Sequence, residues 1–465
     1  MTHLIKSYSA QLLLHCYSDR AVFYTLLSRF LSICFGPLVI LAVGVYLNPK
    51  QQGVYYVFGS LLQLRSLIDL GFSPSTQQLL SNRFSNLIFS REGLHGEKNR
   101  LDEFLNLSKF TLKIYVWIGF ITIFAVGLLG ENFLSSQLDA HSDISWRGAW
   151  WLMIVCVGLG NSALGVTVIA DGANQVVLTN KWRFWNELSS LCVFVVVLFL
   201  GGGLWASAAM AFTRLWLIFP ILYGMGNGFR NQICSANTTA VSFRKTILPL
   251  QSKMMVVWVL SFVCYYAYNP FSLHFVGPVF AGVIGMSMQI SNMTSSLSLV
   301  WYNTKISRLG NLAGNNDVAG AIALNKKGAI ISMALWLMFA ICAWTATFLL
   351  KSYFPTMGAR IAPLGSITIF LISSGAFIWC HIRGSFIRAF CVELFVPLAI
   401  TQGVGTVVLL WLFIPRLGFY GPSLTALITM VIGVIWVEIG YRSFLKKQVF
   451  KCPANNPLRH QAPHF

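Results

Sequence analysis

The chain has 465 residues, of which 56% are hydrophobic and only 10% are charged. A soluble globular domain carries about 25% charged residues, so this composition excludes a soluble protein of this length. Apolar stretches of about 20 residues recur along the chain, and a helix of that length crosses a bilayer. We therefore expect an all-α polytopic membrane protein without a large soluble catalytic domain.

The net charge is +19, from 33 Lys and Arg against 14 Asp and Glu. In a membrane protein such an excess is typical of cytoplasmic loops that face anionic lipid. No basic stretch with interleaved aromatic residues lies outside the apolar runs, so nucleic-acid binding is not expected. The ten cysteines are scattered, with no two at CxxC spacing, and the eight histidines are dispersed. This pattern predicts neither a metal site nor another cofactor.

About twelve transmembrane helices are predicted, at 22–47, 53–73, 106–130, 148–170, 184–200, 204–224, 247–268, 276–301, 328–350, 361–382, 390–414 and 419–441. The first run is too long for the apolar core of a cleavable signal, so we interpret it as a true span. Loops on one side of this layout hold 24 Lys and Arg, and those on the other side hold five. The positive-inside rule then predicts that both termini are cytoplasmic. Fourteen spans would require one longer run to be split.

The two halves of the chain resemble each other, which predicts two six-helix lobes. Asn48-Pro49 follows the first span and Asn269-Pro270 follows the seventh, while GGGLWASAAMA (201–211) and RLGFYGPSLTA (416–426) match at an offset of 215. Duplicated bundles of this kind are typical of transporters. We divide the chain into a cytoplasmic N-terminus (1–21), an N-lobe of spans 1–6 (22–225), a cytoplasmic linker (226–246), a C-lobe of spans 7–12 (247–441) and a basic cytoplasmic tail (442–465).

The loops leave little room for catalysis. The outer loops are short except for about 131–147, and no GxxxxGK[ST] motif occurs anywhere. The chain therefore does not hydrolyse ATP through a P-loop, and transport would draw on an ion gradient, the membrane potential or a downhill substrate. We expect a transporter rather than an enzyme.

Charged side chains inside spans cost several kcal/mol and need a partner or a water-filled cavity. Arg65 and Asp69 are four residues apart on the second span and share a helical face, either as a structural pair or as part of a site. Arg29 in the first span and Arg214 in the middle of the sixth add two deep cations. Three arginines outnumber the deep acids of this half, which predicts a cationic cavity for a phosphate or pyrophosphate group.

Three glutamates lie near the predicted ends of spans: Glu187 at the start of the fifth, Glu393 at the start of the eleventh and Glu438 at the end of the twelfth. From these positions a side chain can extend to the membrane interface, so a structural role is favoured for each.

Two further features lie inside spans. Gln289, Asn292 and Ser296 follow an i, i+3, i+7 pattern on the polar eighth span, where they form either packing contacts between helices or a wall facing sugar hydroxyls. Gly36 and Pro37 are predicted to bend the first span, as a gate hinge or only as part of the bundle's shape.

The motifs of residues 28–81 occur together in one known family. They are an arginine early in the first span, Gly-Pro in its middle, QGVYY (52–56) after a short turn, and DLGF (69–72) at the end of the second span. The GLWASA and GFYGPS turns and the segment 174–180 are similar as well. In this combination the chain resembles the O-antigen type of polysaccharide-unit flippases, within the multidrug/oligosaccharidyl-lipid/polysaccharide exporter superfamily.

The resemblance implies a two-lobed fold like that of multidrug exporters of the superfamily, working by alternating access in a bacterial inner membrane. The cargo would be an undecaprenyl-pyrophosphate-linked oligosaccharide, held at its anionic headgroup by Arg29 and Arg65, with Arg214 as a third wall. A proton or a sodium ion is a candidate for coupling, with Asp69, Glu187 or Glu393 as its site. Glycan polymerase or assembly proteins are candidate partners.

Two alternatives stay open. The first is a multidrug/cation antiporter of the same fold, although 21–47 contains no Asp or Glu, where drug exporters carry an acid. The second is a membrane ligase or polymerase of lipid-linked glycans, against which the short outer loops argue. A peptidoglycan-precursor flippase is a nearer relative, but such proteins often have two spans more than we predict here.

Overall fold

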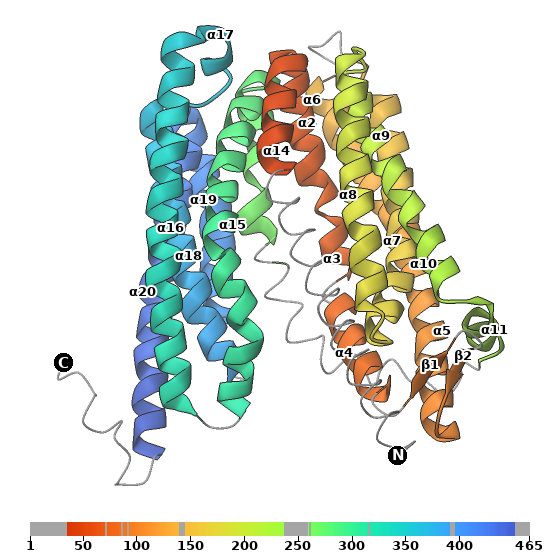
Figure 1. The fold of residues 1–465 in the computed structure, drawn as a ribbon. Coiled ribbons are helices and arrows are strands. Elements are labelled where there is room, and N and C mark those ends of the chain that lie inside the picture. Colours follow the sequence, from red (N-terminus) through yellow and green to blue (C-terminus); the bar gives the residue numbers. More distant parts are fainter. Residues whose placement is uncertain are drawn as a thin grey trace. The chain divides into compact units, whose positions relative to one another are not determined.

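The structure is a computed structural model of the chain, and it describes residues 35–69, 72–84, 87–90, 93–138, 145–236, 259, 262–314, 317–390 and 396–451. Almost all of this part is helical, and its one sheet is a two-stranded hairpin (Figure 1). The all-α architecture predicted from the sequence is therefore confirmed. Arg29, Glu393, the predicted N-terminus, residues 237–246 of the predicted linker and most of the predicted seventh span lie outside the described residues.

The chain divides into two compact units, Met1–Trp258 and Val259–Phe465, and each is considered by itself below. In the N-terminal unit, the helix Phe35–Tyr46 precedes α2 (Pro49–Leu62). A capping box starts α2: the Asn48 side chain accepts a hydrogen bond from the Gln51 amide at 2.7 Å, and the Gln51 side chain accepts one from the Asn48 amide at 3.3 Å. Pro49 fits the first helical position because no hydrogen bond is required of it there.

The predicted second span, 53–73, is not one continuous helix. It consists of α2, a turn at 63–64 and the short helix α3 (Arg65–Asp69), and α4 (Phe72–Phe84) follows. The hydroxyl of Ser60 donates to the carbonyl of Tyr56 at 3.1 Å, and that of Ser66 donates to the carbonyl of Gln63 at 2.6 Å. Serine hydroxyls that bond to the backbone in this way bend helices, which accounts for a break without proline or glycine at the turn.

The remaining helices of this unit follow in chain order. They are α5 (Lys98–Ile121), the π-helix η1 (Thr122–Val126), α6 (Gly127–Leu138), α7 (Arg147–Gly172), α8 (Val176–Phe199), α9 (Trp205–Arg214), the 3-10 helix η2 (Leu215–Leu217), α10 (Ile218–Gly224) and α11 (Asn227–Ser235). Between α4 and α5 lies the hairpin of β1 (Ile88–Ser90) and β2 (Gly93–His95). The Gln232 side chain accepts from the Leu94 amide at 2.8 Å and donates to the Leu94 carbonyl at 3.2 Å, which fixes α11 against β2.

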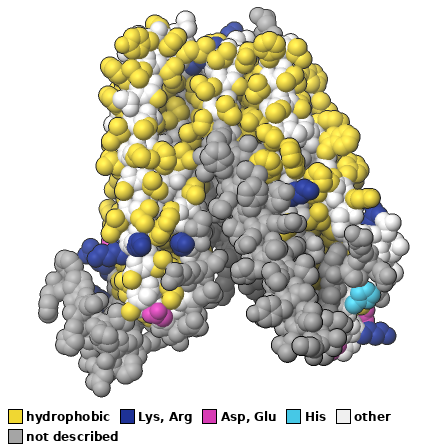
Figure 2. Space-filling model, in the orientation of Figure 1, with side chains coloured by type: hydrophobic (Ala, Val, Ile, Leu, Met, Phe, Trp, Pro, Cys, Tyr) yellow, Lys and Arg dark blue, Asp and Glu magenta, His cyan; other side chains and the backbone are white. Residues whose placement is uncertain are grey.

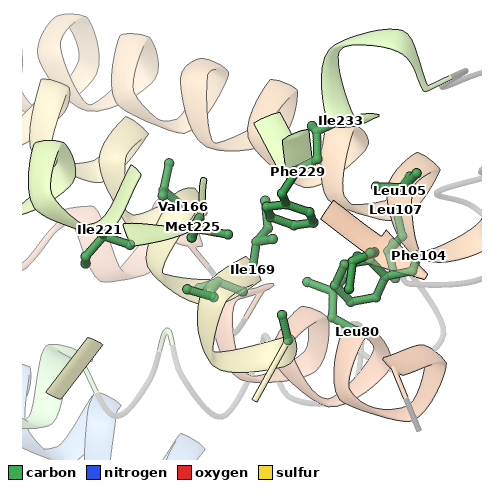
Figure 3. Packing of buried hydrophobic residues seen from close by; sticks show 14 of the residues in the cluster. Leu80, Phe104, Leu105, Leu107, Val166, Ile169, Ile221, Met225, Phe229 and Ile233 are labelled. Carbon is green, nitrogen blue, oxygen red and sulfur yellow. The ribbon is translucent and has the colours of Figure 1, made fainter. Parts of the chain in front are cut away.

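A hydrophobic core holds these elements together at the end of the unit that carries α11 and the hairpin (Figure 3). Phe104 from α5, Ile169 from α7 and Phe229 from α11 are buried in it, and Leu80 joins them from α4. Burying side chains of this size contributes about 1.5–3 kcal/mol each. Helix α4, which precedes the β1–β2 hairpin, and helix α5, which follows it, therefore pack in the same hydrophobic core.

The C-terminal unit contains α14 (Tyr268–Phe275), α15 (Pro278–Gly314), α16 (Val318–Tyr353), α17 (Pro355–Gly358), α18 (Leu364–Ala389), α19 (Val396–Leu417) and α20 (Tyr420–Lys451). Helices α15, α16, α18, α19 and α20 pack side by side (Figure 1). Gly277 (φ 116°) precedes α15 and Gly418 (φ 54°) precedes α20, and each adopts the left-handed conformation that glycine tolerates.

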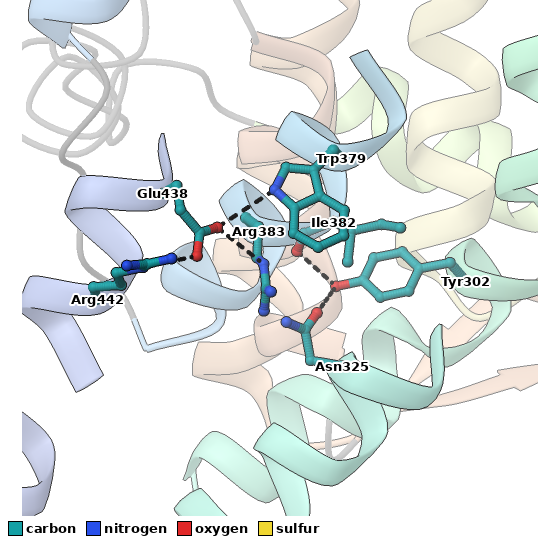
Figure 4. Close-up of polar contacts among 7 residues, drawn as sticks. All are labelled: Tyr302, Asn325, Trp379, Ile382, Arg383, Glu438 and Arg442. Atoms are coloured by element: carbon teal, nitrogen blue, oxygen red, sulfur yellow. Dashed lines mark hydrogen bonds and ion pairs between the residues drawn. The ribbon is translucent and has the colours of Figure 1, made fainter. Parts of the chain in front are cut away.

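Helix α18 is longer than predicted, because Arg383 lies inside it rather than in a loop. The Arg383 side chain is only 15% exposed, and its guanidinium lies 4.6 Å from the Trp379 ring centre and 4.1 Å from that of Tyr441. The Glu438 carboxylate forms ion pairs with Arg383 at 3.5 Å and with Arg442 at 3.2 Å (Figure 4). Because Arg383 stacks on two aromatic rings and pairs with Glu438, the helix can continue through this buried charge. Hydropathy alone does not predict such an extension.

Eight helices of the described part are long and apolar enough to cross a membrane, and the shorter apolar helix Phe35–Tyr46 adds to them. Their outer faces carry large hydrophobic side chains, such as Trp117, Phe199 and Ile439, which are more than 60% exposed. On the face shown in Figure 2, hydrophobic side chains cover most of the described helices. This surface fits lipid, and the chain is a multi-pass membrane protein.

Candidate functional site

Arg65 and Asp69 are both on α3, which packs against α5 and η1. Both are half-buried, and the Asp69 carboxylate lies near Arg65, Ser73 and the Tyr115 hydroxyl. One oxygen of Asp69, Oδ1, is buried without a hydrogen bond in the described part of the chain. The structure thus brings the two predicted residues together in one short helix, beside a carboxylate oxygen with spare hydrogen-bonding capacity.

Glu187 is not near the start of its span, contrary to the prediction. Helix α8 begins at Val176 and ends at Phe199, so Glu187 lies close to its middle, about 16 Å from its start at 1.5 Å per residue. The sequence obscures this because Asn180, Lys181 and Arg183 make the first part of α8 look like a loop. A glutamate in the middle of an apolar helix is stabilised by a polar neighbour.

That neighbour is Arg214, the last residue of α9, which packs along α8. Arg214 is exposed on the unit's surface, and Glu187 and Tyr55 are its electrostatic neighbours. The amide of Asn186 donates to the carbonyls of Thr213 and Arg214, each at 3.3 Å, where α9 gives way to η2. Arg214 and Glu187 are therefore a second arginine and carboxylate that are electrostatic neighbours in the N-terminal unit.

These two pairs change the charge balance expected from the sequence. Arg65 lies near Asp69 and Arg214 near Glu187, so two cations face two carboxylates among the described residues. The predicted cationic excess now depends on Arg29, which lies outside the described part.

The C-terminal unit contains a pocket of about 530 Å³. Its walls come from the segment before α14 and from α14, α15, α18 and α20, and their polar members are serines, tyrosines and one asparagine: Ser291, Ser295, Ser296, Ser373, Ser374, Tyr265, Tyr266, Tyr268 and Asn292. The remaining lining residues are Cys264, Met288, Phe370, Phe377, Ala426 and Met430. No Asp, Glu, Lys or Arg of the described part lines it, so the pocket is uncharged, with hydroxyl and amide groups among apolar side chains.

The predicted polar face of the eighth span contributes to this pocket only in part. Asn292 and Ser296 line it, together with Met288, Ser291 and Ser295 at helical spacing, whereas Gln289 is not among its lining residues. The hydroxyl of Ser296 donates to the Asn292 carbonyl at 2.8 Å, and that of Ser295 donates to the Ser291 carbonyl at 3.1 Å. Because these hydroxyls donate to their own helix, they offer oxygen lone pairs to a ligand, while the Asn292 amide offers donors.

An aromatic wall completes the pocket, and no pattern in the sequence indicates it. Tyr265 is 40% exposed and meets Phe377 edge to face, with ring centres 5.7 Å apart. His381 lies one turn further along α18, where its Nε2 is 3.3 Å from Oδ1 of Asn303. Only the packing of helices from separate parts of the chain brings these rings to one surface.

Gly36 and Pro37 are helical, and they stand at the edge of the described residues. The bend expected there stays a prediction.

Comparisons with known proteins support the fold. No family model matches the chain, and no curated protein sequence matches it. Among solved structures, it is similar to the lipid II flippase MurJ in an inward closed conformation, with a TM-score of 0.64 and 12% identity over 92% of this chain and 90% of that one. It is also similar to an inward-facing multidrug resistance MATE family transporter of the MOP superfamily, with a TM-score of 0.60 and 12% identity over 89% of this chain and 96% of that one.

A third similar structure is a MATE protein in the bent conformation, with a TM-score of 0.58 and 12% identity over 93% of this chain and 97% of that one. The chain is thus a polytopic, all-α membrane protein of the fold that MurJ and the MATE transporters share. At this level of identity, the likeness defines the fold and leaves the cargo to be argued from the two sites.

Proposed function

We propose that the protein is a flippase that moves an undecaprenyl-pyrophosphate-linked oligosaccharide, such as the repeat unit of O-antigen or another surface polysaccharide, across a bacterial inner membrane by alternating access. The two units would rock about the cargo while its polyprenyl chain stays in lipid. The fold supports this proposal because a lipid II flippase and multidrug transporters both use it. Both termini would be cytoplasmic, as the distribution of Lys and Arg predicts.

The uncharged pocket of the C-terminal unit is the observation that carries the proposal. A sugar ring has hydroxyl groups at its edge and apolar C–H faces, so it matches serine oxygens and an asparagine amide next to tyrosine rings. An organic drug cation would be stabilised by a carboxylate, and none lines the pocket in the part of the chain described. Asn292 and Ser296 are the residues we assign to the sugar.

The arginines of the N-terminal unit would bind the pyrophosphate. A guanidinium matches phosphate oxygens with two parallel donors, so pyrophosphate competes well with a single carboxylate for Arg65 and Arg214. The carboxylate that loses its arginine must then be neutralised, and a proton or a sodium ion does this. In this way, cargo binding at Arg214 would be coupled to ion binding at Glu187. Cargo binding at Arg65 would likewise be coupled to ion binding at Asp69.

A multidrug/cation antiporter is the second candidate, and the tyrosines favour it. Aromatic faces attract organic cations, and Tyr265, Tyr266 and Tyr268 all line the pocket. A membrane ligase or polymerase acting on the same glycans is a third candidate, but no specific feature of the described residues supports it.

Deletion of the gene tests the proposal. The lipid-pyrophosphate pool of the deletion strain is extracted and analysed by mass spectrometry, and the surface glycan is measured in parallel. We expect the surface glycan to be lost and a complete, unpolymerised lipid-linked unit to accumulate in the inner leaflet, as an assay of sidedness would show. Accumulation in the outer leaflet would instead indicate a polymerase or ligase. An unchanged pool with increased drug sensitivity would indicate the antiporter and overturn the proposal.

A further inference from the structure

A second cavity lies where α15 ends and α16 begins, away from the 530 Å³ pocket described above. It measures about 550 Å³ and is lined by Trp301, Lys305 and Leu312 from α15, by Gly320, Ala323, Leu324 and Lys327 from α16, and by Asp317 at the start of α16. The residues from α16 recur at helical spacing, so they form one face of that helix. The proposed transport cycle uses none of these residues.

The position of this cavity along α16 corresponds to a lipid headgroup. Residues 328–350 contain no charged side chain, and Lys327 and Lys351 stand at the two ends of this run. A helix of this length, at 1.5 Å per residue, is about 35 Å long, close to the thickness of a bilayer's hydrocarbon core of about 30 Å. Lys327 therefore lies at the level of the phosphate groups of one leaflet, which is the cytoplasmic leaflet in the predicted orientation.

The chemistry of the cavity suits an anionic phosphate. Lys305 lies over the Trp301 ring with Nζ 6.0 Å from the ring centre, and Trp301 is suited to the interface because its ring is amphipathic. Asp317 is the only acid among the described residues that line the cavity, and its side chain accepts a hydrogen bond from the Gly320 amide at 2.8 Å. Its charge is thus directed to the helix N-terminus, where it is stabilised, and the two lysines remain to bind an anion.

We propose that this cavity, the Lys305–Lys327 site, binds the phosphate group of an anionic lipid in the cytoplasmic leaflet. Two lipids carry this chemistry there: a bulk phospholipid such as phosphatidylglycerol, and a polyprenyl phosphate of the kind that would carry the cargo. The site depends on the membrane position of α15 and α16 and not on the proposed flippase activity. It would fix the cytoplasmic end of the hairpin to the membrane surface.

Native mass spectrometry of the purified full-length protein tests the site. The protein is released from nanodiscs of phosphatidylcholine that contain about a tenth of phosphatidylglycerol, and the bound phosphatidylglycerol is counted. We expect Lys305→Gln and Lys327→Gln each to lower its retention about fivefold, since one basic residue near the surface contributes about 1 kcal/mol. The matched control is Lys326→Gln, which removes the same charge from the neighbouring, exposed position outside the cavity.

The Lys326→Gln control distinguishes a specific lipid-binding site from non-specific attraction of anionic lipid by positive charge. Retention that falls equally in Lys326→Gln and Lys327→Gln would overturn the proposal, and so would retention that is unchanged in Lys305→Gln and Lys327→Gln. In a second set of nanodiscs, undecaprenyl phosphate replaces half of the phosphatidylglycerol. Preferential retention of undecaprenyl phosphate would identify the carrier lipid as the ligand, and equal or weaker retention would identify the bulk phospholipid.

Discussion

Arg214 and Glu187 lie on adjacent helices, α9 and α8, and are electrostatic neighbours. Arg214→Gln removes the forked donor that we assign to the pyrophosphate. A hydrogen bond to a charged group contributes about 1.5–3 kcal/mol, so we expect export of the glycan to fall by about tenfold or more. Glu187→Gln keeps Arg214 but replaces the neighbouring carboxylate by an amide that is always neutral. Export should then lose its dependence on the ion gradient.

Both effects are measured in the deletion strain complemented with each variant, as surface glycan with and without a protonophore or a sodium ionophore. Arg230→Gln on α11 is the matched control, because Arg230 is exposed at the end of the unit that carries the hydrophobic core around Phe229. Normal export by Arg214→Gln at normal protein abundance would contradict the role given to this arginine.

Asn174 has a structural role at the same scale. It adopts φ 57° where α7 ends, and the Gln175 amide donates to the Ala170 carbonyl at 2.8 Å while the Asn174 amide donates to the Asp171 carbonyl at 3.1 Å. This is the Schellman arrangement, in which a left-handed residue closes the helix. Asn174→Ala should destabilise the protein by about 1 kcal/mol, because the short polar side chain of asparagine compensates for the strain of the left-handed conformation through local hydrogen bonds and alanine has no such group.

Thermal unfolding of the detergent-solubilised protein measures this effect. Asn174→Gly should leave the unfolding midpoint nearly unchanged, since glycine adopts the left-handed conformation freely. If alanine and glycine lower the midpoint equally, the Asn174 side chain rather than the backbone conformation stabilises the turn.

At the scale of elements, α5 and α7 approach each other through glycines. A Cβ on Gly158 would lie 2.8 Å from the Gly119 carbonyl oxygen and would clash with the side chain of Ile123. Small residues allow membrane helices to pack this closely, and the Asn161 amide adds a hydrogen bond of 3.1 Å to the Thr122 hydroxyl. We expect Gly158→Ala to separate the helices and to cost about 1–3 kcal/mol.

Gly160→Ala on the same helix is the control, because its Cβ would meet only Leu215 at 3.7 Å. That variant should be neutral, or more stable by about 0.5–1 kcal/mol, because alanine favours the helix over glycine. The two variants are compared by thermal unfolding. Equal stability would show that the α5–α7 contact adjusts without cost.

The elements also show what the sequence could and could not predict. Most spans follow from apolar runs, since hydropathy reports directly which segments can enter lipid. The break at 63–64, the early start of α8 and the extension of α18 past Arg383 were not anticipated. At the break, serine hydroxyls bond to the backbone of their own segment. At the start of α8, Thr179 and Arg183 bond to the Asp171 carboxylate, and in α18, Arg383 pairs with Glu438. Hydropathy reports none of these contacts.

The same limit applies to the sites. Helical spacing pointed to Asn292 and Ser296, because i, i+3, i+7 positions share a face in any helix, but it also pointed to Gln289, which does not line the pocket. Tyr265 and the pairing of Glu187 with Arg214 depend on which helices become neighbours, and one sequence does not contain that information. The predicted excess of positive charge stays a prediction, because it depends on Arg29, which lies outside the described residues.

At the scale of the whole molecule, the proposed function divides the work between two units: charge in the N-terminal unit and sugar recognition in the C-terminal one. The polar face of α15 provides a matched pair of substitutions for this division. Asn292 lines the pocket and Gln289 does not, although both are amides on the same helix. Replacing either by leucine removes the amide and keeps a side chain of similar size.

We expect Asn292→Leu to lower export about tenfold through the loss of one or two hydrogen bonds to the sugar, each contributing about 0.5–1.5 kcal/mol. Gln289→Leu should export normally. Surface glycan and the accumulated lipid-linked unit are measured in complemented deletion strains, with protein abundance as the control for folding. An export defect in Gln289→Leu equal to that in Asn292→Leu would indicate that the polar face packs helices together, and the pocket would then lose its assigned role in recognising the cargo.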